Sequence, residues 1–327
     1  MPFLLIAIIV VALISDFLNG FHDASNIVAT MISSRAMSPR SAPLISAAAH
    51  FAGPFLFGVA VATTIGQEVV DPAAITSAVI IAALCSAILW NLFTWYFGWP
   101  SSTSHALIGG LVGAVVVAAG FDTIRMEGLE KVLIALFISP ILGLVLGYLV
   151  LKLIYFLSRG ASPRINTFLK RGQLGTSLAL ALSHGTNDAQ KTMGIIAMAM
   201  VTTGYVTEFQ VPWWVIALSA GAISIGTASG GWRLIETRGG RFYKIRPVHA
   251  FGSQLTSAGV ILGAALLGGP VSTTQVVSSA IMGAGSADRV SKVRWTVARD
   301  IAVAWVLTIP GSALLAAGLY LLVDLFL

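Results

Sequence analysis

The chain has 327 residues, of which 57% are hydrophobic and only 10% are charged, and its formal net charge is +6. A soluble domain carries roughly 25% charged residues, because polar side chains must cover its surface. The composition therefore excludes an ordinary cytosolic enzyme, a disordered chain and a nucleic-acid-binding domain, and it predicts an integral membrane protein in contact with a lipid bilayer.

Apolar stretches follow one another almost from end to end. A hydrocarbon core about 30 Å thick needs about 20 apolar residues in one helix. Pro100 and Pro270 each open a short segment, which we interpret as a half-helix or a re-entrant hairpin, so the sequence predicts an all-α polytopic protein of about ten to twelve helices. The predicted segments are residues 3–33, 42–65, 73–97, 99–120, 132–157, 173–204, 212–230, 248–268, 270–286 and 299–324.

Lys and Arg residues gather in alternate loops. Arg35 and Arg40 follow the first segment, and the stretches 158–172, 231–247 and 287–295 are rich in Lys and Arg. Cytoplasmic loops carry an excess of these residues. We therefore expect ten crossings of the plasma (inner) membrane, with the basic loops in the cytoplasm and both termini outside.

Two motifs occur twice in the chain. The run Gly20-Phe-His-Asp-Ala-Ser-Asn matches Gly185-Thr-Asn-Asp-Ala-Gln-Lys at an offset of 165, and the hydroxyl-rich run from Pro100 matches the run from Pro270 at an offset of 170. The sequence thus predicts two five-span repeats, 1–157 and 173–327, joined by a basic cytoplasmic linker at 158–172. An odd number of spans inverts the second repeat, as is typical of secondary transporters.

Asp23 and Asp188 occupy equivalent positions in these repeats, within apolar segments. A charged side chain in a span costs at least about 2.5–3.5 kcal/mol, which favours a functional role over a structural ion pair or a helix cap. Carboxylate and amide oxygens suit Na⁺ or a proton better than zinc or copper. We expect Gly20 and Gly185 to weaken the helix and free carbonyl oxygens. The neighbouring amides are Asn19, Asn26, Asn187 and Gln190.

Hydroxyl side chains follow the two prolines. They are Ser101, Ser102, Thr103 and Ser104 after Pro100, and Ser272, Thr273 and Thr274 after Pro270. Proline suits the first turn of a helix, where backbone N–H groups are unpaired and the helix dipole favours an oxyanion. The pair of segments therefore predicts a site for a tetrahedral anion, although such hydroxyls can also cap a kinked helix or bond two helices together.

Two interpretations stay open for each of three further sets of residues. Lys191 follows Asp188 by three positions, so it can pair with that acid or contact the anion. We interpret His22, His105 and His184 as hydrogen-bonded packing residues, although each could carry a proton. Asp16 has Ala181 at the equivalent position of the second half, so it breaks the symmetry and can have a separate cation or structural role.

The motifs together resemble the inorganic phosphate transporter (PiT) family in its prokaryotic form, over nearly the whole chain. The resemblance lies in Asp-Phe-Leu-Asn-Gly-Phe-His-Asp-Ala-Ser-Asn at 16–26, His-Gly-Thr-Asn-Asp-Ala-Gln at 184–190 and Gly-Trp-Pro-Ser-Ser-Thr-Ser-His at 98–105. Ser25 departs mildly from the usual family pattern. The resemblance implies a non-enzymatic protein without a cofactor, which imports phosphate with co-transported Na⁺ or H⁺ by alternating access through an inverted repeat.

The resemblance also implies roles for particular residues. Cation coupling is expected at Asp23, Asn26, Asn187 and Asp188, with Na⁺ on Asp23 and Asp188 if sodium is the coupling ion. Phosphate is expected near Ser101–Ser104 and Ser272–Thr274, with Asn26, Gln190 and Lys191 as further candidate ligands. Some bacterial members carry sulfate, which stays an alternative; an anion channel is a weaker one, because rings of basic residues are missing. A homodimer is expected from the family.

Overall fold

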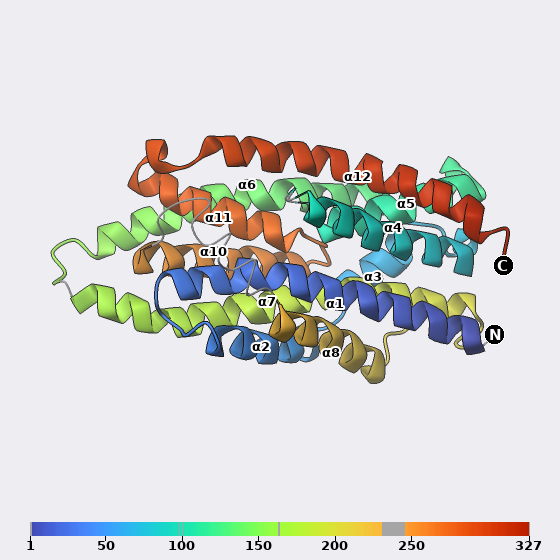
Figure 1. Ribbon diagram of the computed structural model, residues 1–327, viewed down its shortest axis with the longest axis horizontal. Coiled ribbons are helices and arrows are strands. Elements are labelled where there is room, and N and C mark those ends of the chain that lie inside the picture. Colours follow the sequence, from blue (N-terminus) through green and yellow to red (C-terminus); the bar gives the residue numbers. More distant parts are fainter. Residues whose placement is uncertain (1, 98, 100, 163, 231–245, 327) are drawn as a thin grey trace.

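The computed structural model describes residues 2–97, 99, 101–162, 164–230 and 246–326, which form an elongated bundle of helices (Figure 1). Among these residues the extended backbone pairs at an isolated bridge, Val70 with Ile124, so the prediction of an all-α membrane fold is confirmed. The helices are α1 (Pro2–Ser33), α2 (Ser41–Phe57), α3 (Ala60–Thr63), α4 (Ser77–Tyr96), α5 (Thr103–Ala119), α6 (Met126–Leu157), α7 (Arg164–Thr202), α8 (Trp213–Ser229), α10 (Pro247–Leu266), α11 (Thr273–Asp288) and α12 (Trp295–Val323), with short turns η1 (Thr64–Glu68), η2 (Pro72–Ala74), η3 (Phe121–Thr123) and η4 (Val290–Lys292).

The predicted segment 42–65 is not one straight span. Gly58 ends α2 with a φ of 80°, a conformation that glycine adopts without the penalty of a Cβ atom. The chain then continues as α3 and η1, bent by 74° from α2. The apolar composition could not reveal this break, because the residues on both sides of Gly58 are equally apolar.

Two hairpins enter the bundle from opposite ends (Figure 1). The hairpin of α4 and α5 comes from the end that holds both chain termini, and the hairpin of α10 and α11 comes from the other end. Helices α5 and α11 have only 17 and 16 residues, as expected of half-helices. Their tips meet, since Ser104 Oγ donates a hydrogen bond of 2.9 Å to the carbonyl oxygen of Val271.

The number of spans that length and hydropathy support is smaller than the ten predicted. Over the described residues, four helices are long and apolar enough to cross a membrane, and the bent pair of α2 with α3 and η1 would make a fifth. Helices α5, α8 and α11 are short, and α7 carries polar residues at its centre. A helix that buries polar side chains inside the bundle fails a hydropathy test even where it runs the length of the molecule.

Helix α7 begins earlier than predicted. The sequence predicted a linker at 158–172, but the helix starts at Arg164 and runs for 39 residues, about 58 Å at 1.5 Å per residue. That length exceeds the roughly 40–45 Å of a bilayer with its headgroups. The basic residues Lys170 and Arg171 therefore lie in the first turns of helix α7 and not in a loop.

Helices of the two halves pack reciprocally. Helix α1 packs against α8, and α2 packs against α7. In the same way α5 contacts α12 while α6 contacts α11, and α4 contacts α12 while α6 contacts α10. Each of these contacts between a helix of the first half and one of the second is thus repeated with the halves exchanged.

Two apolar clusters enclose a polar middle layer. One contains Ile8 of α1 and Met193 of α7, and the other contains Ile27 of α1 and Leu180 of α7. The buried acids Asp16, Asp23 and Asp188 lie between these clusters along the chain. Outside, α6 and α12 expose many large apolar side chains, among them Ile134, Leu149, Val306 and Leu314, as a lipid-facing surface requires.

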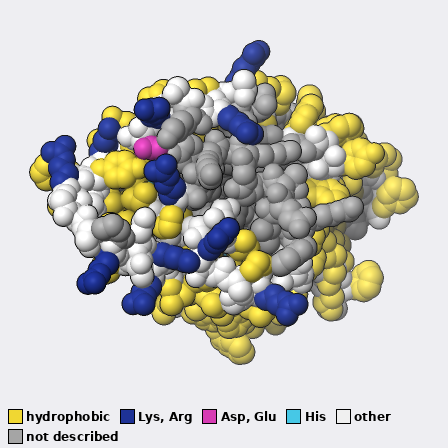
Figure 2. All heavy atoms as spheres, turned by 60° about the vertical axis from the view of Figure 1, so that its left-hand side comes forward, with side chains coloured by type: hydrophobic (Ala, Val, Ile, Leu, Met, Phe, Trp, Pro, Cys, Tyr) yellow, Lys and Arg dark blue, Asp and Glu magenta, His cyan; other side chains and the backbone are white. Residues whose placement is uncertain are grey.

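The two ends of the bundle differ in charge. Figure 2 shows Lys and Arg side chains gathered over the end where α1 and α6 end and α7 begins. Basic residues of this end are Arg35, Arg40, Lys152, Arg159, Arg164, Lys170, Arg171, Arg246, Arg289, Arg294 and Arg299. The opposite end holds Glu68, Asp71, Asp122, Glu127, Glu130, Glu208 and Asp324, with Arg125 and Lys131 paired to Asp71 and Glu68. Most of the predicted basic loop 231–247 lies outside the described residues.

Candidate functional site

The two repeat-related acids come together at the tip of the second hairpin. Asp23 of α1 and Asp188 of α7 are both buried. Thr273 Oγ1 lies 3.4 Å from Asp23 Oδ2 and 3.0 Å from Asp188 Oδ2, so one hydroxyl reaches both acids. Thr274 Oγ1 donates to Asp23 Oδ1 at 2.5 Å. We call Asp23, His184, Asp188, Lys191, Thr273 and Thr274 the carboxylate cluster.

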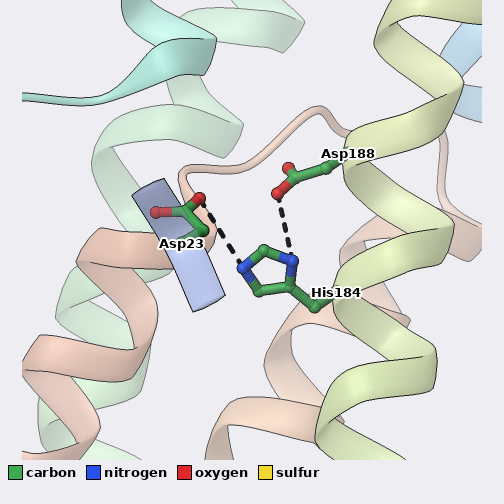
Figure 3. Close-up of side chains that lie close together, drawn as sticks. All are labelled: Asp23, His184 and Asp188. Carbon is green, nitrogen blue, oxygen red and sulfur yellow. Dashed lines mark ion pairs between the residues drawn. The ribbon is translucent and has the colours of Figure 1, made fainter. Parts of the chain in front are cut away.

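His184 lies between the two carboxylates (Figure 3). Its Nδ1 is 3.2 Å from Asp188 Oδ2, and its Nε2 is 3.7 Å from Asp23 Oδ2. The sequence favoured a packing role for this histidine, and its place in the cluster was not predicted. The available signal was its spacing, because residues four apart on a helix share a face. The equivalent position in the first half holds Asn19, so repeat matching gave no hint.

A second histidine supports the first from behind. The ring of His50 of α2 stacks on that of His184, with centroids 5.0 Å apart and planes 11° apart. His50 Nδ1 lies 2.8 Å from Thr227 Oγ1 of α8, which fixes the His50 ring. The stack holds the His184 ring in the plane that turns its two nitrogens toward the two carboxylates.

Lys191 of α7 joins the cluster to both hairpin tips. Its ammonium group donates to Asp188 Oδ1, to Ser104 Oγ at 2.5 Å and to the carbonyl oxygen of Val271 at 2.9 Å. An ammonium group has three donors, and all three are used here. The ion pair that the sequence analysis considered is present, so an anion could reach Lys191 Nζ only by replacing one of these partners.

Asn187 holds the unwound chain before α11. Its Nδ2 donates to the Gly269 carbonyl oxygen at 3.1 Å, and its Oδ1 accepts from the backbone N–H of Val271 at 3.1 Å. Irregular backbone inside a membrane is stable only where other groups satisfy its N–H and C=O groups. The side chain of Asn187 does this for the residues that flank Pro270, and it thereby fixes the position of Thr273 and Thr274.

Gln190 serves the other break in the bundle. Its Oε1 accepts from the backbone N–H groups of Val61, at 2.8 Å, and Ala62, at 3.4 Å. These are unpaired N–H groups at the start of α3. Gln190 was a candidate substrate ligand, but the structure engages it in holding the bend after Gly58.

The two hydroxyl segments differ in what they contact. Ser102 caps α5 by accepting from the His105 N–H at 3.3 Å, and Thr103 Oγ1 donates to Asn19 Oδ1 at 2.9 Å. Ser101 Oγ donates to Asn91 Oδ1 at 3.4 Å. Of the first segment, only Ser104 meets the cluster, through Lys191. In the second segment Thr273 and Thr274 face the acids, while Ser272 is buried with no hydrogen-bond partner for its hydroxyl.

The predicted role of Asn26 stays a prediction, because its side chain lies outside the described part of the structure; its backbone belongs to α1. The expectation for the two motif glycines is wrong. Helices α1 and α7 run unbroken through Gly20 and Gly185. A Cβ on Gly20 would meet the Ile223 carbonyl of α8, and one on Gly185 would meet the backbone of His50. Both glycines therefore permit close helix contacts.

The cluster offers oxygen and nitrogen donors to a cation. Ligand atoms of Asp23, His184 and Asp188 all lie within 4.8 Å of one another. The carboxylates with the Thr273 hydroxyl form a hard oxygen set that fits Na⁺, whereas the imidazole nitrogen favours softer metals or a proton. With His184 neutral, two carboxylates and one ammonium give the cluster a formal net charge of −1, which favours a cation and disfavours an anion alone.

Comparison with known proteins gives consistent matches. The sequence profile of the "Phosphate transporter family" matches residues 19–162 and 155–316. The chain is 43% identical over 326 residues to a "Probable low-affinity inorganic phosphate transporter" of Bacillus subtilis (strain 168), covering 98% of each chain. It is 44% identical over 324 residues to a protein of the same description from Rhizobium meliloti (strain 1021), covering 98% and 97%. A solved structure described as "The sodium-dependent phosphate transporter" has the same fold, with a TM-score of 0.91, 24% identity and full coverage of both chains.

Proposed function

Because this chain belongs to the phosphate transporter family, we propose that it imports inorganic phosphate together with Na⁺ or H⁺, by alternating access around the carboxylate cluster. The observation that carries the proposal is the contact of one hydroxyl, that of Thr273, with both Asp23 and Asp188. The Thr273 hydroxyl thereby connects the start of α11, where we propose that the anion binds, with the two acids that we propose bind the cation. Both ligands would then share one site.

Electrostatics supports coupled binding. Two unit charges 4 Å apart interact by about 4 kcal/mol at an effective dielectric constant of 20. A phosphate anion entering a cluster of net charge −1 would be repelled by that order of energy. A cation bound first to Asp23 or Asp188 removes the repulsion, so each ligand raises the affinity for the other.

The anion site is formed by groups that are neutral or shared. Thr273 and Thr274 stand in the first turn of α11, where backbone N–H groups and the helix dipole favour an oxyanion. Ser104 and Lys191 are the further donors of the proposed anion site, and both now donate to the carbonyl oxygen of Val271. Phosphate would replace the hydrogen bonds that these groups now make to one another and to the acids. Because these groups exchange one hydrogen-bond partner for another and lose none, phosphate can bind and dissociate reversibly.

The reciprocal packing of helices supports an inverted repeat of residues 1–157 and 173–327. Contacts of α1 with α8 and α2 with α7, and of α5 with α12 and α6 with α11, are those that a two-fold relation between the halves requires. Hairpins from opposite ends with touching tips support a position of the cluster at the interface of the proposed repeats. Rocking of one half against the other would then open the cluster to each side in turn.

The charge of the two ends supports an orientation. The basic end, which includes Arg35, Arg164 and Arg289, would face the cytoplasm, and both termini would lie outside. In the plasma membrane each negative charge moved inward against 100 mV costs about 2.3 kcal/mol. Two monovalent cations would offset a phosphate dianion, and a third would let the membrane potential drive uptake.

Other functions have less support. The named relatives are phosphate transporters and not enzymes, and no finding favours sulfate. A channel would not need an acid in each half. The homodimer stays a prediction from the family resemblance.

Uptake of labelled phosphate and labelled sulfate into proteoliposomes tests the proposal, with Na⁺ and pH gradients imposed separately. We expect saturable phosphate uptake that depends on one of the two gradients. Flux that does not saturate, or that ignores both gradients, would contradict it.

A further inference from the structure

A second acid, Asp16, lies in the middle of α1 and outside the carboxylate cluster. It is only 2% exposed, and its Oδ2 atom has no hydrogen-bond partner. None of the ion pairs between described residues involves Asp16. Burying an ionised carboxylate without a partner costs free energy. Asp16 therefore needs a positive charge that balances its own, or a ligand at its Oδ2 atom.

The basic residue beside it is fully engaged. The side chain of Thr192 of α7 lies close enough to Asp16 to act on its carboxyl group. Lys191 precedes Thr192 on the same helix, but its three donors go to Asp188, Ser104 and Val271. Lys191 therefore has no donor left for Asp16. Helices α4 and α8, which pack against α1, contain no Lys, Arg or His.

A second buried oxygen lies level with Asp16. Helices α1 and α8 run side by side in the same direction, with Gly20 against Ile223 and Ala24 against Gly230, the residue that follows α8. Asp16 lies one turn before Gly20, and Ser219 lies one turn before Ile223, each on the contacting face of its helix. Ser219 is fully buried and its Oγ has no partner. Since neither atom is paired, the two oxygens are further apart than a hydrogen bond.

We infer that Asp16, Thr192 and Ser219 form a separate Na⁺ site between α1, α7 and α8. A carboxylate with two hydroxyls is a hard oxygen set of the kind that binds Na⁺. The site exists once, because the position equivalent to Asp16 in the second half is Ala181. A Na⁺ ion bound at this site would add one positive charge to each transport cycle. This part of the inference rests on the proposed function.

Equilibrium binding of ²²Na⁺ to the purified protein without phosphate tests the site directly. We expect Asp16→Asn to bind one Na⁺ fewer per chain at saturation than the wild type. Ser219→Ala and Thr192→Val keep the carboxylate, and each should raise the Na⁺ concentration for half-saturation of one site by threefold or more. Ser224→Ala is the matched control on α8, because its hydroxyl bonds the Ala220 carbonyl at 2.6 Å, and it should bind as the wild type does.

The inference fails if Asp16→Asn binds Na⁺ with unchanged stoichiometry and affinity, or if the wild type binds no Na⁺. If Asp16→Asn does not fold, wild-type affinity in both hydroxyl variants overturns it. Binding needs no transport, so loss of phosphate uptake in the wild type would refute the proposed function and leave this result intact. In liposomes that transport, Asp16→Asn should lower the cation-to-phosphate ratio, obtained from the reversal potential, by one.

Discussion

His105 and Gln275 face each other across the hairpin tips, with His105 Nδ1 3.4 Å from Gln275 Nε2. The two residues are 170 positions apart, which is the offset between the two hydroxyl motifs. In a two-fold arrangement only residues close to the axis contact their own equivalents. This pair therefore supports a two-fold axis that passes between α5 and α11, next to the carboxylate cluster.

Neutralising either acid of the cluster is expected to abolish coupled uptake. In Asp23→Asn and Asp188→Asn the proposed cation site loses a charged ligand, while the side chain keeps its shape. Labelled phosphate uptake under a cation gradient should fall at least a hundredfold, with the protein still inserted. Asp122→Asn is the control, because Asp122 is exposed in η3, and it should transport normally. Full transport by both cluster variants would remove the acids from the mechanism.

Substitutions of the hydroxyl residues at the hairpin tips should distinguish effects on the affinity for phosphate from effects on the stability of the fold. Thr273→Ala and Thr274→Ala each remove a donor near the anion, so the KM for phosphate should rise about tenfold or more, since one hydrogen bond to a charged group contributes about 1.5–3 kcal/mol. Thr→Ser at either position keeps the hydroxyl and should restore the KM.

Ser102→Ala, by contrast, removes the N-cap of α5. It should lower stability by about 0.5–2 kcal/mol with little change of KM. A Tm series in detergent beside the uptake kinetics checks both expectations. A KM effect in Ser102→Ala as large as that of the threonine variants would contradict this division.

Lys191 is expected to be necessary for stability as well as transport. Lys191→Gln leaves Asp188 buried without its cation, and loss of one partner from a buried pair costs about 3–5 kcal/mol. The double variant Lys191→Gln with Asp188→Asn should recover part of the lost Tm. Lys170→Gln, at an exposed position of the same helix, is the control and should keep the wild-type Tm. A double variant less stable than both single variants would argue against the pair.

The close contact of α2 and α7 can be tested with one methyl group. Gly185→Ala places a Cβ 2.5 Å from the His50 carbonyl oxygen, so the helices must separate and carry the stacked histidines apart. Overpacking of this kind costs about 1–3 kcal/mol. Gly175→Ala on α7 meets no atom within 4 Å and should gain about 0.5–1 kcal/mol from helix propensity. Equal Tm values for the two variants would exclude a steric role of Gly185.

The sequence alone determined the class of protein and the candidate residues at its centre. Scarce charge predicted a membrane protein, and repeated motifs selected Asp23, Asp188 and the hydroxyls after two prolines. Proline suits the start of a helix, and Pro100 and Pro270 each open a short apolar segment, so the half-helices α5 and α11 could be expected without a structure. These features are local or repeated along the chain, and both kinds of pattern are visible in a single sequence.

Only the tertiary structure decided which polar groups meet. It placed His184 between the two acids, turned Gln190 toward Val61 and left only Ser104 of the first hydroxyl segment at the cluster. It also showed that Gly185 serves helix contact. A side chain's partner on another helix depends on how the helices cross and at what level they meet. Residue type and spacing along one helix do not contain that information.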